Sequence, residues 1–114
     1  MTMTHKEVAK MVKDIGLPYA YYQFPEGTNQ KLPFITYFYL GTNDVMADNT
    51  NYQRVERLSI ELYTKNKDFE KEALIESALS SHGLTYVRED SYIDTEKMWQ
   101  IAYEMEVIIN GKQG

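Results

Sequence analysis

The sequence predicts a single α+β domain, built as an antiparallel sheet of four to five strands with two helices packed on one face, in the order α-β-β-β-α-β-β. Two segments, 5–15 and 69–82, have the apolar spacing of helices. The remaining long segments alternate in polarity or are rich in β-branched and aromatic residues, which is typical of strands. The chain has 114 residues, a length that favours one domain, 1–114, with one core.

The first helix has clear start and stop signals. Thr4 and Glu7 have the spacing of a capping box, in which each side chain satisfies the backbone amide of the other residue. Gly16 can take the left-handed conformation that ends a helix, and Pro18 prevents its continuation. The predicted apolar stripe consists of Val8, Met11, Val12 and Ile15.

Two strands are expected next, at 19–24 and 33–40. The second, PFITYFYL, carries no charge and would be an aggregation hazard at an exposed edge, so we expect it to be central. It leads into a polar connection at 41–52, which is much longer than an ordinary hairpin loop. We expect residues 41–52 to form a long, flexible loop.

The third strand follows this loop. Leu58, Ile60 and Leu62 alternate with polar residues, as in a half-buried strand, whereas Val55 falls out of phase and predicts either a bulge or the start of the strand near 55–57. A second helix begins after Asn66 or Asp68. Its expected apolar side consists of Phe69, Ala73, Ile75, Ala78, Leu79 and His82, and Gly83 ends it.

Two further strands complete the domain. They are expected at 84–90 and at 97–109, with a turn at 91–94 between them. The last strand alternates apolar residues from Trp99 to Ile109 with a polar face that includes Glu104 and Glu106. The tail 110–114 should fray.

Composition excludes several classes of function. The net charge of −5 argues against binding to nucleic acid or to an anionic membrane surface. The absence of cysteine excludes disulfides, thiolate metal sites and cysteine nucleophiles. We find neither a signal peptide nor a membrane span, and expect a soluble chain made in the cytoplasm. The ten tyrosines favour half-buried sheet faces and contact surfaces.

No catalytic or metal-binding motif is found, and we expect no enzyme activity, metal or cofactor. His5 and His82 have no ligand partner at helical spacing. Asp44 and Asp48 lack the spacing and the glycine of a calcium loop. The carboxylates of the last strand and Glu61 are more typical of a solvated sheet face than of an acid–base pair.

The whole pattern resembles the small tail-terminator, tail-completion and minor capsid proteins of the head–tail module of long-tailed phages and prophages. The resemblance covers nearly the whole chain and is carried by LPFITYFYLGTNDVMADNTNYQRVERLSIELYT, by the helix KDFEKEALIESAL and by the closing WQIAYEMEVI. It implies a structural virion protein that forms a homo-oligomeric ring, often a hexamer. Its partners would be the tail tube and the head–tail connector.

Under this resemblance the 41–52 loop is a docking arm. Its expected contact residues are Asn43, Asp44, Val45, Met46, Asp48 and Asn49. Tyr39 and Tyr63 are candidate contacts on the outer face of the sheet.

Two alternatives remain open from the sequence. One is a small ligand-binding or enzymatic domain in which Glu61 and Glu104 line a pocket. The other is a regulatory domain outside any virion, which binds partners through a helix and an edge strand.

Overall fold

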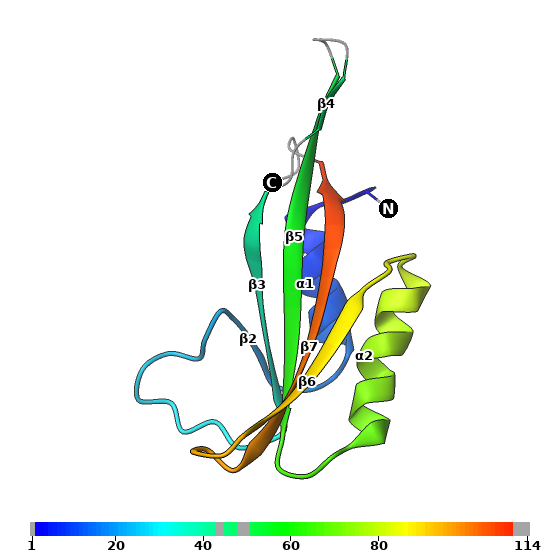
Figure 1. The fold of residues 1–114 in the computed structure, drawn as a ribbon. Helices are drawn as coiled ribbons and strands as arrows, with labels where there is room; N and C mark the ends of the chain where they lie inside the picture. Colours follow the sequence, from blue (N-terminus) through cyan, green and yellow to red (C-terminus); the bar gives the residue numbers. More distant parts are fainter. Residues whose placement is uncertain (1, 43–44, 48–50, 111–114) are drawn as a thin grey trace.

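The computed structural model describes residues 2–42, 45–47 and 51–110, which form a curled sheet with both helices on one face (Figure 1). The helices are α1 (His5–Asp14) and α2 (Phe69–Ser81). The strands are β1 (Thr2–Met3), β2 (Tyr19–Tyr21), β3 (Phe34–Thr42), β4 (Val45–Ala47), β5 (Asn51–Thr64), β6 (Val87–Ile93) and β7 (Met98–Ile109). The α+β class is confirmed, whereas the predicted order omits β1 and β4.

The sheet has the strand order β1-β7-β5-β3-β2, with β6 also paired to β7 and β4 paired to β5. Its centre is antiparallel, and β3 has neighbours on both sides as predicted. The expectation of a wholly antiparallel sheet is wrong at the edges, because β1 pairs with β7 and β2 pairs with β3 in parallel. Parallel neighbours need a long crossover, and residues 22–33 are that crossover, so the strand expected at 19–24 ends at Tyr21.

The first helix forms as its local signals predict. Thr4 accepts a hydrogen bond from the Glu7 amide, and the Glu7 carboxylate accepts one from the Thr4 amide. Gly16 has a φ of 93°, which is in the region that favours glycine. The predicted apolar stripe of α1 is buried against the sheet.

One hydrophobic core lies between the sheet and the two helices. Alternate residues of β5 and β7 enter it, as the period of two in the sequence predicts. The members contributed by the three central strands are Ile35, Tyr37, Leu58, Ile60, Leu62, Ile101, Tyr103, Met105, Val107 and Ile109. The bulge expected in β5 lies instead in β3, where the register shifts between Tyr39 and Gly41. The pairing of β5 with β7 is uninterrupted.

The second helix differs from its predicted apolar side. Ile75 and Leu79 are buried, but Phe69 is exposed and the charged Glu72 is buried. One carboxylate oxygen of Glu72 forms an ion pair with the Arg88 guanidinium at 2.6 Å, and the other forms one with the Lys67 ammonium at 2.7 Å. These two cations offset the cost of removing a carboxylate from water.

Arg88 joins α2 to β6 through several groups. Its guanidinium also donates to Glu76 and Asp90, and Tyr103 donates its hydroxyl proton to Glu76. The hydrogen bond from Arg88 holds the pKa of Asp90 well below its usual range. The strand expected at 84–90 forms as β6 but lies three residues later, at Val87–Ile93. The prediction of a turn at 91–94 is therefore wrong. Residues 94–97 make that turn, because Ile93 still pairs with Met98.

Candidate partner-contact surface

The most prominent feature of the surface is a two-stranded arm, defined as β4 together with residues 51–53 of β5. Strand β7 accompanies β5 only as far as Arg54, which lies opposite Ile109. Beyond that point, the described part of β5 pairs with β4 alone. The arm therefore extends past the body of the sheet (Figure 1), in a molecule whose extents are 50 × 29 × 24 Å.

The arm continues the β3–β5 hairpin. Thr42 lies opposite Glu56 and Val45 lies opposite Gln53, so the pairing register is the same on both sides of residues 43–44. A two-stranded ribbon is at best marginally stable in water. Contact of such a ribbon with a partner would therefore cost the core of the domain little.

The expectation of a flexible loop over 41–52 is wrong where the chain is described, because Gly41 and Thr42 lie in β3, 45–47 are β4 and 51–52 lie in β5. The length and polar composition of this segment predicted a loop. The β-prone residues of VMA and NYQRV, which indicate strands, were a weaker signal. Of the predicted contact residues, Val45 and Met46 lie in β4. Asn43, Asp44, Asp48 and Asn49 lie outside the described residues, as does the tail from 111 onward.

Tyr63 lies on the sheet face opposite the helices, as predicted. Its ring stacks on Phe34 with 5.0 Å between ring centroids. Its hydroxyl donates to Glu61 at 2.8 Å and accepts a hydrogen bond from Gln100 at 2.8 Å. Burial and the Glu61 carboxylate raise the pKa of Tyr63 to about 12. The hydroxyl is therefore used within the fold.

This raised pKa predicts a loss of stability in alkali. In the unfolded chain a tyrosine ionises near pH 10, whereas folded Tyr63 keeps its proton up to about 12. Its contribution to stability is complete below pH 10 and is lost as the pH rises from 10 to 12. A tyrosinate-absorbance titration of the wild type minus that of Tyr63→Phe should show one group titrating near 12. A difference curve centred near 10 would contradict the assignment.

Tyr39 lies on the helix face, so the prediction that it shares the outer face with Tyr63 is wrong. Its hydroxyl is 2.8 Å from Nδ1 of His5, at the start of α1. Tyr21 contacts both Tyr37 and Tyr39 through its ring, and its hydroxyl accepts a hydrogen bond from the Tyr39 amide. Tyr39 is on this face because it alternates regularly with the buried Ile35 and Tyr37, before the register shift.

One aromatic surface was not predicted from the sequence. Tyr19, Tyr21 and Tyr22 are exposed at the β2 edge of the sheet. The available signal was an uncharged aromatic run directly after Pro18. Such side chains combine an apolar body with a polar tip, a combination that is common in protein interfaces.

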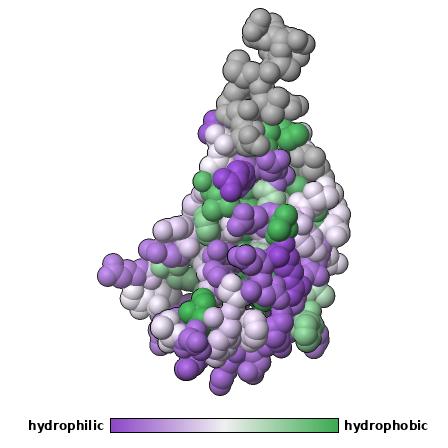
Figure 2. Space-filling view, in the orientation of Figure 1, coloured by the Kyte–Doolittle hydropathy of each residue, from purple (hydrophilic) through white to green (hydrophobic). Residues whose placement is uncertain are grey.

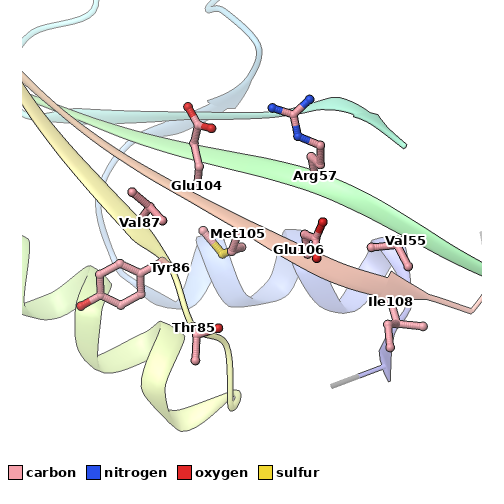
Figure 3. A pocket seen from close by; sticks show the side chains of 9 residues that line it. All are labelled: Val55, Arg57, Thr85, Tyr86, Val87, Glu104, Met105, Glu106 and Ile108. Atoms are coloured by element: carbon pink, nitrogen blue, oxygen red, sulfur yellow. The ribbon is translucent and has the colours of Figure 1, made fainter. Parts of the chain in front are cut away.

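A notch lies along the outer edge of β7, which is flanked by β6 up to Glu104 and by β1 from Ile108. Its volume is about 530 Å³. Figure 3 shows Arg57 and Glu104 pointing to the same side of the sheet. Glu61, the other carboxylate of the predicted pair, instead accepts hydrogen bonds from Thr36 and Tyr63. The notch does not bring the two carboxylates together as that alternative requires.

Among the described residues, no three histidine or carboxylate side chains lie close enough to hold a metal ion. His82 bonds through Nδ1 to the Ala78 carbonyl. The helices of the described ranges are too short or too polar to cross a bilayer. Figure 2 shows a mostly hydrophilic face with small, separate apolar patches.

Comparison with solved structures shows a likeness of fold. The fold is similar to that of a chain in a structure titled "Virion of native gene transfer agent (GTA) particle", with a TM-score of 0.56 and 15% sequence identity. The match covers 88% of this chain and 84% of that chain. No protein-family model matches the sequence, and no curated protein matches it. At this identity the likeness shows a shared fold over most of both chains.

Proposed function

We propose that this chain is a structural protein of a phage or phage-like virion and that it acts by contact with other virion proteins. The fold likeness supports the proposal because the similar chain comes from a virion particle. The observation that carries it is the arm, in which β4 and residues 51–53 pair with each other beyond the last residue of β7. Such a ribbon contributes little to the hydrophobic core of the domain and is suited to contact with a partner.

Within the virion, the chain fits a ring at the end of the tail or at the head–tail junction. In that position the chain would act as a tail terminator, a tail completion protein or a head–tail joining protein. Its partners would be the tail tube and the head–tail connector. The arm would reach the next subunit or ring. The predicted contact residues stay Asn43, Asp44, Val45, Met46, Asp48 and Asn49. The net charge of −5 supports a channel wall to which DNA does not adhere. The proposal assigns no catalytic residue.

The direct test is to look for the chain in particles. Phage-like particles from cells that encode it should be purified on a density gradient and probed with an antibody against the chain. We expect the chain to sediment with intact particles and immunogold label to mark one end of the tail or the head–tail junction. Particles from cells lacking the gene are the control. A chain that is abundant in the lysate but absent from the particles would refute the proposal.

A further inference from the structure

Large apolar side chains are exposed on two opposite sides of the molecule. Eight such side chains are exposed in the described part of the chain. Four lie at the β2–β3 side of the sheet, and four lie on α2 and β6. The first group is Tyr19, Tyr21, Tyr22 and Leu40, and the second is Phe69, Leu74, Val87 and Tyr92. Two separate apolar sides suggest two different contact surfaces.

The β2 edge has backbone groups that face outward. The Ile35 amide donates to the Pro18 carbonyl and the Tyr22 amide donates to the Tyr37 carbonyl. Positions 18 and 22 therefore turn toward β3, and because alternate residues of a strand face opposite neighbours, Tyr19 turns its N–H and C=O groups and Tyr21 its N–H group toward the open edge. The Tyr21 carbonyl accepts a hydrogen bond from the Gln23 amide, at the turn that ends β2. The edge residues Tyr19–Tyr21 carry no charge, so they lack the usual protection against strand addition.

The opposite side of the sheet ends in β6. This seven-residue strand pairs with β7 on one side, and six of its residues, from Val87 to Tyr92, are exposed. Its direction is opposite to that of β2, since β2 is parallel to β3 and the steps from β3 to β5, β7 and β6 are all antiparallel. Two copies placed side by side in the same orientation would therefore present β2 and β6 as antiparallel neighbours.

We propose that β2 of one copy of this chain pairs with β6 of the next copy, so that the sheet continues from subunit to subunit. The exposed side chains match face by face. On the outer face, Tyr22, which contacts Phe38 and is 63% exposed, would meet Val87, which is 75% exposed. In the same register, Tyr21, which is 51% exposed, would lie opposite Arg88 on the helix face, and Tyr19, which is 38% exposed, would lie opposite Asp90. Antiparallel pairing is the more stable arrangement of two strands.

Charge favours this pairing over contact between two identical edges. Residues 66–97, which include α2 and β6, carry eight carboxylates and four cationic side chains. Two β6 edges would repel each other, whereas the β2 edge is neutral and its tyrosine hydroxyls can donate to carboxylates such as Glu89. A contact between two different patches closes into a ring or continues as a filament. Closure into a ring rests on the function proposed above, and the strand pairing itself does not.

Cysteine trapping tests the pairing directly, because the chain has no cysteine of its own. An equal mixture of Tyr22→Cys and Val87→Cys should give a disulfide-linked heterodimer under mild oxidation, since a disulfide requires neighbouring backbones. Mixtures of Tyr22→Cys with Tyr92→Cys, on the opposite face, and of Tyr22→Cys with Leu74→Cys, on α2, should give no more than background. Equal yields in all three mixtures, or a dominant Tyr22→Cys homodimer, would overturn the proposal.

Charge variants give a second measurement that needs no oxidation. In sedimentation velocity over a wide concentration range, Tyr22→Glu and Val87→Lys should each weaken self-association about tenfold or more, because each would bury an unpaired charge. Leu74→Glu is the matched control and should associate like the wild type. Mixing Tyr22→Glu with Val87→Lys should restore self-association, because each variant keeps one intact edge and because the two introduced charges are opposite and attract each other across the other contact.

The outcomes separate this inference from the proposed function. A wild-type chain that stays monomeric up to its solubility limit and yet is present in particles would overturn the strand pairing and leave the virion role standing. A chain that associates through β2 and β6 and is absent from particles would support the strand pairing and overturn the virion role.

Discussion

Shortening the arm is expected to abolish particle assembly while leaving the domain folded. In the variant considered, residues 45–53 are replaced by Asn-Gly, the turn preferred in two-residue hairpins. The strand pairing then closes just beyond Arg54, the last β5 residue that pairs with β7. The removed segment pairs only with itself in the described structure, so the free energy of unfolding should change by no more than about 1 kcal/mol.

Two measurements are needed for this variant. Urea unfolding followed by circular dichroism reports on the fold, and the titre of infectious or DNA-transferring particles reports on assembly. The matched control is the same replacement at residues 94–97, the turn between β6 and β7 at Ile93 and Met98. That variant should assemble normally. If the arm variant also assembles normally, the arm is not the docking element.

Arg88→Ala is expected to destabilise the fold more than any other change on the surface. Arg88 is one of two cations bound to Glu72, which is only 2% exposed, and it also binds Glu76 and Asp90. Removing it leaves Glu72 buried with Lys67 alone. Because breaking a buried pair leaves an uncompensated charge, the loss should be about 3 kcal/mol. The free energy of unfolding measured in urea checks this value.

Lys10→Ala is the control for that prediction. Lys10 and Asp14 form an equally short ion pair at 2.6 Å, but both side chains are largely exposed. An exposed pair on one helix face contributes about 0.5 kcal/mol or less. If the two variants lose similar stability, burial of Glu72 is not what makes the Arg88 network important.

Local chemistry in the sequence was sufficient to predict much of this fold. The capping box of Thr4 and Glu7 and the stop at Gly16 predicted α1 to within one residue. Alternation in LSIEL and in WQIAYEMEVII predicted which side chains of β5 and β7 enter the core. These signals suffice because caps act within one turn of helix and a strand has a strict period of two. The central position of β3 in the sheet was predicted from its lack of charged residues, because an uncharged strand at an exposed edge would favour aggregation.

Features that join distant segments were decided only by the tertiary structure. Glu72 is buried with Lys67 and Arg88, which come from outside its helix, and Tyr39 faces α1 because it lies opposite the buried Leu58 in the pairing of β3 with β5. The parallel edges and the arm depend on where the chain returns to the sheet, which short-range periodicity does not encode. The open β2 and β6 edges likewise became visible only once the strand directions were known, because an edge is a property of the whole sheet and not of any one strand.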